Sequence, residues 1–419
     1  MSNGPGDNNP FEGMFGPGGF DINALLGQLQ SLMQPYDGVL NWDAAIDMAR
    51  KASSADGADP SVTSRDADRI ADALRLADHW LDDTTTFASG VRTPAAWSRA
   101  DWLLQTLTTW KSLVEPVVES STKTLQGNIP PEMAAMVGPM VGFLGKAVGA
   151  MYATQAGQGL GALAGEVLAS SDIGIPLAPA GQAALLPTNI AAFASGLGVE
   201  IEDVTLYLAL REAAHQRLFA GVPWLREHVL EAVRAHAAGV EINMEAIQER
   251  IQEQMGSVNP ADPAALEDLL SSGLFDIPQS PAQKAALEKL EIVLALIEGW
   301  VDEVVGQATA SRMPVATQLQ EAVRRRRAAG GPAEQTFATL VGLEMRPRRL
   351  RDASTLWGSL RSRQGVEARD GVWMSPALLP TSADLDDPLG FREGASQPDS
   401  LTDEAFDAEL QKLLENPDA

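Results

Sequence analysis

Hydrophobic residues recur every three or four positions along most of the chain, which is the spacing of an amphipathic helix. From about residue 41 to residue 365, prolines and glycines divide this pattern into segments. It predicts helices at 64–81, 94–122, 130–168, 203–219, 224–239, 243–256, 263–272, 281–308, 314–329, 331–345 and 348–363. Evidence for strands is thin, and residues 184–187 and 371–374 are expected to form short edge strands. We therefore predict a mainly α-helical fold with at most a small β element.

The two ends of the chain differ from this pattern. Residues 1–20 are rich in glycine, asparagine and proline and are expected to be flexible, and a short amphipathic helix should follow and end at Pro35. Residues 381–419 hold 11 acidic and 2 basic residues, which predicts a flexible acidic tail with another short amphipathic helix. We expect a flexible segment 1–36, a helical domain 37–380 and a tail 381–419. Each terminal helix could dock on its own domain or bind a partner.

Small residues occupy every fourth position from 145 to 165 in the predicted helix 130–168. They are Gly145, Gly149, Ala153, Gly157, Gly161 and Gly165. Each interior glycine costs about 1 kcal/mol of helix stability relative to alanine, so such a ridge suggests that another backbone approaches closely. A membrane dimer with this spacing would need an uncharged apolar segment, and charged residues such as Lys146 and Glu166 interrupt this one.

The amino-acid composition argues against several classes of function. The chain has 31 basic and 56 acidic residues, and a net charge of −25 argues against binding nucleic acid or anionic membranes with the whole surface. It has no cysteine, which excludes disulfides and thiolate catalysis and suits a reducing compartment. The first residues lack a secretory signal, and no uncharged apolar window reaches 18 residues. We expect a cytoplasmic protein without a membrane span.

Residues 311–370 carry a net positive charge in an otherwise acidic chain, with 12 arginines against 6 acidic residues. Arg324 to Arg327 form a continuous run. We interpret the segment as a solvated helical face that balances the acidic remainder, with an RNA or DNA patch as the alternative. No aromatic interleaving or known nucleic-acid motif accompanies the run, so no nucleic-acid partner is expected. A protein or peptide partner stays open, as does the oligomeric state.

The strongest candidate for chemistry is the predicted helix 203–219, which is apolar on nearly all sides over its first half and should be buried. Arg211 and His215 lie one turn apart on the same face, with Glu212 one position round. In His-Glu-x-x-His, this spacing presents two imidazoles to zinc and a carboxylate to the attacking water. Here the first histidine is an arginine, which stays protonated and cannot ligate a metal.

The predicted helix 281–308 supplies two more carboxylates. Its apolar residues step by three and four positions and form a core-facing stripe. Glu298 lies beside that stripe and Asp302 follows one turn later. A guanidinium from Arg211 could occupy the position of a metal and pair with Glu298, Asp302 or Glu212, which would satisfy buried acids.

Residues 208–219 and 222–226 resemble the bacterial, mostly actinobacterial, zinc-dependent metalloprotease family of zincin-like hydrolases. Further similar segments are 186–190, 296–299, 342–346 and 379–388, so the resemblance covers roughly residues 130–390. It implies a zincin-like helical fold, with Glu212 as general base and His215 and Glu298 as metal ligands if zinc is bound. It also implies that Asp302 orients a histidine. The chain is similar to a branch of the family with Arg-Glu-x-x-His in place of His-Glu-x-x-His.

Two ligands instead of three, beside a cation, would bind zinc poorly. We therefore expect a degenerate metal site without a cofactor, in which Arg211 and Asp302 make binding contacts, and a non-catalytic binding or regulatory protein. The alternative is an active zinc-dependent metalloprotease or hydrolase in which Arg211 grips a substrate carboxylate or an oxyanion. His228 and His236 on the next predicted helix could replace a metal ligand, but a lone histidine on an apolar face is more often a hydrogen-bonded core residue, which is the interpretation we favour.

Overall fold

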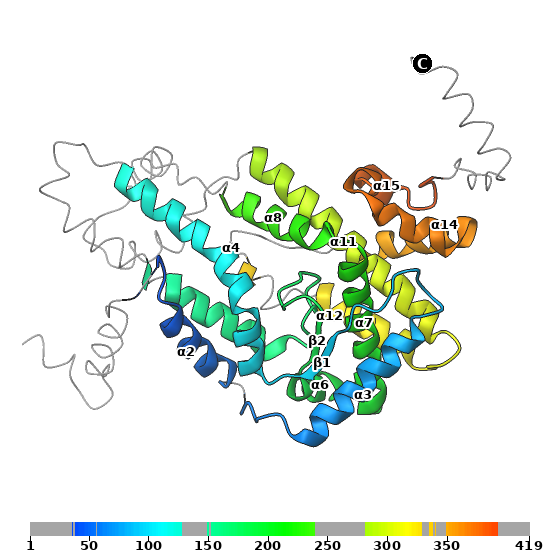
Figure 1. Ribbon diagram of the computed structural model, residues 1–419, viewed down its shortest axis with the longest axis horizontal. Coiled ribbons are helices and arrows are strands. Elements are labelled where there is room, and N and C mark those ends of the chain that lie inside the picture. Colours follow the sequence, from blue (N-terminus) through cyan, green and yellow to red (C-terminus); the bar gives the residue numbers. More distant parts are fainter. Residues whose placement is uncertain are drawn as a thin grey trace, which may run out of the picture.

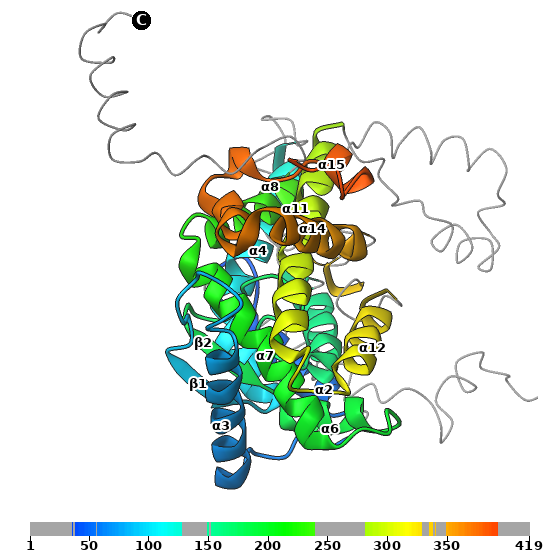
Figure 2. The same cartoon turned by 90° about the vertical axis from the view of Figure 1, so that its right-hand side faces the viewer.

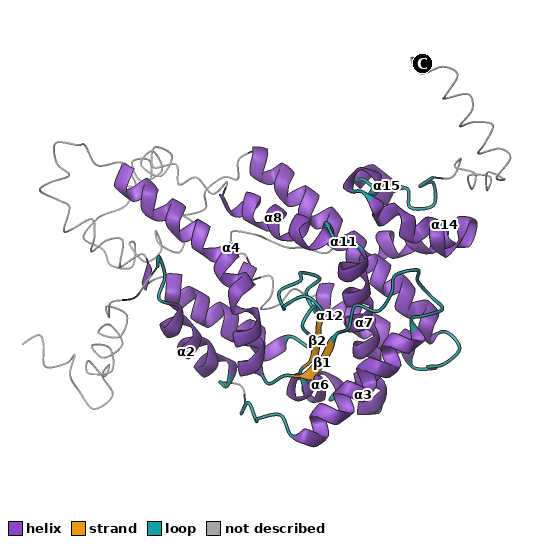
Figure 3. Cartoon of the chain, in the orientation of Figure 1, coloured by secondary structure: helices purple, strands orange, loops and turns teal. Residues whose placement is uncertain are grey.

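A computed structural model describes residues 36–127, 149–238, 281–328 and 349–392, apart from residues 37, 56 and 151, together with residues 335–337 and 340. Several predicted helices lie outside these residues: the helix before Pro35, the helices 243–256 and 263–272, and the helix in the acidic tail. Most of the predicted helix 331–345 lies outside them as well. The described residues are mainly helical with one small sheet, as the hydrophobic pattern predicts (Figure 3). None of their helices combines the length and the apolarity needed to cross a membrane.

The elements follow one another along the chain in a simple order. The first part contains α2 (Trp42–Ser53), α3 (Ser64–Trp80), β1 (Thr93–Ala96), α4 (Arg99–Gly127), helical residues 152–166, β2 (Gln182–Leu185) and α6 (Pro187–Ala194). The second part contains α7 (Ile201–Gly221), α8 (Leu225–Ala238), α11 (Pro281–Thr309), α12 (Ala316–Ala328) and α14 (Leu350–Gly371). It ends with the 3-10 turns η2 (Val372–Met374) and η3 (Pro376–Leu378) and with α15 (Ser382–Asp386).

Two long helices, α7 and α11, form the centre of the packing (Figure 1). On its other sides α11 contacts α14 and α8, while α7 also contacts α3 and β2. In the view turned by 90°, α8, α14 and α15 gather at one end of the molecule and α3 and α6 at the other, with α12 beside α11 (Figure 2). Polar side chains on the facing sides of α7, α11 and α12 are therefore brought together inside the protein.

The small sheet differs in part from its prediction. β1 pairs with β2 in parallel, with Thr93 opposite Gln182, and β2 overlaps the predicted strand 184–187. Residues 94–96 were expected to begin a helix, but their backbone pairs with a strand almost 90 positions away, which local periodicity does not detect. The predicted strand 371–374 is wrong, because these residues end α14 and form η2. The helices α2 and α6 were not predicted as separate elements.

Packed structure continues past residue 381, where the acidic tail was expected to begin. Thr381 starts α15 with a capping box, in which its side chain and that of Asp384 bond each other's backbone. Leu385 is buried against the rest of the protein. These first tail residues therefore belong to the packed structure, and residues from 393 onward lie outside the described part.

Part of the ridge of small residues packs as predicted, because the backbone of α2 lies against Gly157 and Gly161, while Gly145 lies outside the described residues. A Cβ atom on Gly157 would lie 2.8 Å from the carbonyl oxygen of Ala45. On Gly161 it would lie 2.6 Å from the carbonyl oxygen of Ala49 and 2.5 Å from the Cβ of Ala52. Glycine at these positions therefore allows two helices to approach within backbone contact.

Replacing Gly161 by alanine should destabilise the protein by about 1–3 kcal/mol, because α2 must move to admit the methyl group. Gly165→Ala in the same helix is the matched control: nothing lies within 4 Å of the added Cβ. This control should be neutral or stabilising by up to about 1 kcal/mol. Urea denaturation of both variants measures the two effects, and equal stabilities would contradict the packing described here.

Candidate functional site

The helix α7 carries its polar residues into the protein interior. Every side chain from residue 207 to residue 218 is buried, including Arg211, Glu212, His215 and Gln216. Charged groups in such a place are stable only when they are paired, because burial removes their hydration. The partners of these side chains therefore define the site.

Arg211 reaches across to α11, as the sequence analysis expected. Its Nη2 donates to Oε2 of Glu298 at 2.6 Å, and its Nη1 lies 3.6 Å from Oδ1 of Asp302. All three side chains are almost fully buried. One guanidinium thus bridges two carboxylates that lie one turn apart on α11.

His215 forms hydrogen bonds through both ring nitrogens. Nδ1 lies 2.8 Å from the carbonyl oxygen of Arg211, and Nε2 lies 2.9 Å from Oε1 of Glu298. Both partners are protein groups, so both ring nitrogens are already engaged in hydrogen bonds. Neither nitrogen is free to bind a metal in this arrangement.

The helix α12 adds further cations that were not predicted as site residues. Arg327 Nη1 lies 2.7 Å from Oε2 of Glu298, and Arg324 pairs with Oδ2 of Asp302. Arg326 pairs with Asp172 at 2.9 Å. The arginine run was interpreted as a solvated face, and this is wrong for these three residues, which turn inward to buried carboxylates. Residues 324 and 327 share a helical face, a signal that points at a common target without identifying it.

Glu298 therefore has three cationic neighbours. Burial alone would raise the pKa of its carboxyl group, but the charges of Arg327, His215 and Arg211 outweigh burial and hold the pKa well below its ordinary value. Burial would lower the pKa of Arg211, and the nearby carboxylates, led by Glu298, raise it instead. Both shifts favour the ionised pair of Arg211 and Glu298.

Glu212, the predicted general base, bonds a different part of the protein. Its carboxylate accepts from Ser170 Oγ at 2.5 Å, from the Ser171 backbone N–H at 3.0 Å and from Gln216 Nε2 at 2.9 Å. Burial is the largest influence on its pKa and raises it, although His215 and these donors act in the opposite direction. Its oxygens are occupied by protein donors, two of them from a segment whose sequence carried no recognisable signal.

Asp302 does not orient a histidine, in contrast to the role implied by the family resemblance. Besides Arg211 and Arg324, it accepts from Gln320 Nε2 and Ser354 Oγ, both at 3.0 Å. The second nitrogen of His215 bonds a backbone carbonyl instead. The reason is local, since Arg211 and Arg324 occupy the space around the carboxylate.

These residues do not fit a zinc ion. Nε2 of His215 and Oε1 of Glu298 are bonded to each other at 2.9 Å, whereas bonds of about 2.0–2.1 Å to a tetrahedral zinc would hold them about 3.3 Å apart. A guanidinium stands at the position of the first ligand, and a second one, from Arg327, shares Oε2 of Glu298. Within the described residues, no three histidine, cysteine or acidic side chains are arranged to hold a metal, and this includes His228 and His236.

Comparison with known proteins gives two findings. The family described as "Zincin-like metallopeptidase" matches residues 40–391, which is most of the chain. A crystal structure from Chloroflexus aurantiacus, described as "a putative hydrolase with a novel fold", is 18% identical and superposes with a TM-score of 0.56. That match covers 83% of this chain and 96% of the other, and at this identity it shows a shared fold alone. No curated protein matches the sequence.

Glu298→Gln should destabilise the protein by about 3–5 kcal/mol near pH 7, because it removes the negative charge that pairs with Arg211 and Arg327. Since the pKa of Glu298 is lowered in the folded state, its stabilisation is present above its ordinary pKa of 4.5 and is lost as the pH falls below it. One pH unit below this ordinary pKa, the difference in unfolding free energy between wild type and variant should be smaller by about 1.4 kcal/mol.

Urea denaturation at the two pH values measures this difference. Glu321→Gln is the control, because Glu321 pairs with Arg351 at the surface of α12, where ion pairs contribute about 0–1 kcal/mol. A difference for Glu298→Gln no larger than the control, or one that does not change with pH, would contradict the charge cluster.

Proposed function

Because the chain belongs to the zincin-like metallopeptidase family, we propose that it has kept the fold but works as a metal-free binding or regulatory protein. The observation that carries this proposal is the buried bond of 2.6 Å between Arg211 and Glu298. A permanent cation in place of a ligand repels Zn²⁺ and already neutralises the carboxylate that would bind it. We also infer that the chain belongs to the branch with Arg-Glu-x-x-His, which residues 211–215 spell out.

The state of the other family residues supports the same conclusion. Metal-assisted hydrolysis needs a ligand histidine with a free lone pair and a carboxylate that can take a proton from water. His215 uses both nitrogens in hydrogen bonds, and Glu212 accepts three hydrogen bonds from protein groups at 3.0 Å or less. Each residue is thus engaged in holding the structure together.

An active metalloprotease in which Arg211 grips the substrate is the alternative. Such a role needs a guanidinium that a substrate can reach, and Arg211 is 5% exposed. Both of its carboxylate partners are also more than nine-tenths buried. We therefore favour the binding role, with a protein or peptide as the partner.

The substitution Arg211→His combined with Arg327→Gln tests the proposal. It removes both guanidinium groups from Glu298 and gives α7 the two histidines of the His-Glu-x-x-His pattern. We expect the double variant to take up zinc during dialysis and to unfold at a higher temperature with zinc than without it. The wild-type chain should show neither effect.

Adding His215→Ala to the double variant is the matched control, and it should abolish the zinc uptake. Peptidase assays of the wild type with and without Glu212→Gln complete the test, since turnover lost in the variant would identify a working enzyme. Stoichiometric zinc in wild-type protein, or peptidase activity that Arg211→His destroys, would overturn the proposal.

A further inference from the structure

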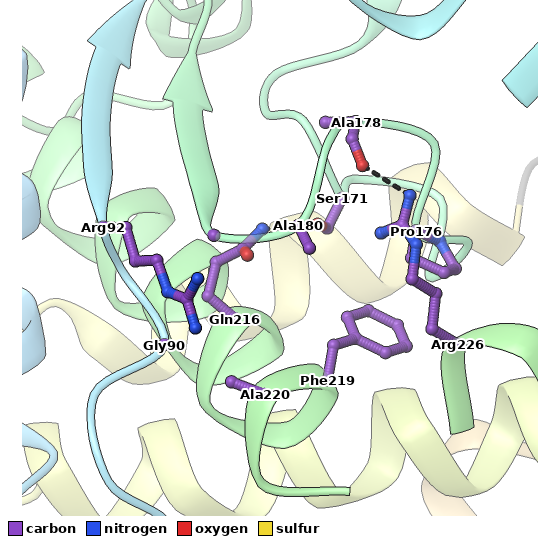
Figure 4. A pocket seen from close by; sticks show the side chains of 11 residues that line it. Gly90, Arg92, Ser171, Pro176, Ala178, Ala180, Gln216, Phe219, Ala220 and Arg226 are labelled. Carbon is purple, nitrogen blue, oxygen red and sulfur yellow. Dashed lines mark hydrogen bonds between the residues drawn. The ribbon is translucent and has the colours of Figure 1, made fainter. Parts of the chain in front are cut away.

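A small pocket lies beside the site, where the end of α7 meets the start of α8 and the segment before β2. Its volume is about 110 Å³. Figure 4 shows Arg92 on one side, Arg226 on the other and the ring of Phe219 between them. Ser171 and Gln216 also line the pocket. It therefore combines two cations with an aromatic surface and two polar side chains.

Neither arginine forms an ion pair with a described residue. Within the described residues, no carboxylate lies within ion-pair distance of Arg92 or Arg226, although the chain carries a net charge of −25. Arg226 donates to a neutral acceptor, the carbonyl oxygen of Ala178, at 2.7 Å. Burial lowers its pKa, and the charge of the neighbouring Glu227 offsets this only in part. An anion in the pocket would supply the missing charge to both side chains.

Two glycines bring Arg92 to the pocket wall. A Cβ atom on Gly90 would lie 2.0 Å from the backbone oxygen of Gln216. Glycine at this position therefore lets the segment before β1 run directly against α7. Gly181 has a φ of +79°, and its carbonyl oxygen accepts from the backbone N–H of Arg92 at 2.9 Å. A Cβ on Gly181 would also press on the stem of Arg92 at 3.0 Å. These contacts fix the backbone and the stem of Arg92 beside the pocket.

We propose that this pocket binds a small carboxylate, with the charged group held by the arginines that line it and the apolar remainder against Phe219. Guanidinium groups match the two oxygens of a carboxylate. A volume of about 110 Å³ corresponds to a few water molecules at about 30 Å³ each, which suits a ligand of the size of propionate. The carboxylate belongs to a free organic acid or to the C-terminus of a peptide.

Titration of the full-length protein with propionate, followed by ligand-observed NMR, tests this site. We expect saturable binding that rising salt weakens, and no binding of propionamide, which is the neutral analogue. Arg92→Gln and Arg226→Gln should each weaken propionate binding about tenfold, the loss expected for one hydrogen bond to a charged group. Arg65→Gln is the matched control, because Arg65 is an exposed arginine on α3 outside the pocket, and it should have no effect.

A tripeptide of alanine with an acetylated N-terminus and a free carboxylate identifies the source of the ligand. Tighter binding than propionate would point to a peptide C-terminus, and no binding would point to a free acid. The site is overturned if propionate does not bind, if propionamide binds equally well, or if the pocket variants behave like Arg65→Gln. Since Arg92 is exposed and makes no ion pair within the described residues, its variant should fold normally even if Arg226→Gln does not. None of these results depends on zinc binding at Arg211.

Discussion

The bond between Arg211 and Glu298 is the constraint around which the centre of this protein is organised. It joins the two central helices, α7 and α11, at a point that water does not reach. A buried carboxylate needs more than one partner to offset its lost hydration, and Glu298 has two further cations in His215 and Arg327. Because Arg327 comes from α12, its ion pair with Glu298 also joins this helix to α11. Each partner also contacts other members of the cluster, Arg211 through Asp302 and Glu298 through His215 and Arg327, so the cluster holds together as a unit.

The same cluster explains why the family's chemistry is absent from the proposed function. In a zinc site, a metal dication would satisfy the carboxylate and the histidine lone pair together. Here guanidinium groups carry that positive charge, and the imidazole forms hydrogen bonds where it would otherwise ligate. Glu212 is correspondingly turned into a structural acceptor for Ser170 and Ser171. These contacts of Arg211, His215, Glu298 and Glu212 with other protein groups support the proposed metal-free role.

Much of this arrangement could be predicted from the sequence, because it depends on helical spacing. The four-residue steps from Arg211 to His215 and from Glu298 to Asp302 place each pair on one helical face, and long apolar stretches mark both helices as buried. The partners from elsewhere could not be predicted. Arg324 and Arg327 reach the site through the packing of α12, and β1 pairs with residues almost 90 positions away. Such contacts are set by tertiary structure, which leaves no periodic trace in the chain.

A crystal structure of the wild-type chain grown with excess zinc, with anomalous data collected at the zinc edge, is the most direct test of the central claim. We expect the guanidinium of Arg211 to stay within hydrogen-bond distance of Glu298, with no anomalous peak between Glu298 and His215. A peak bonded to Nε2 of His215 and to the carboxylate of Glu298, with Arg211 displaced, would contradict this expectation.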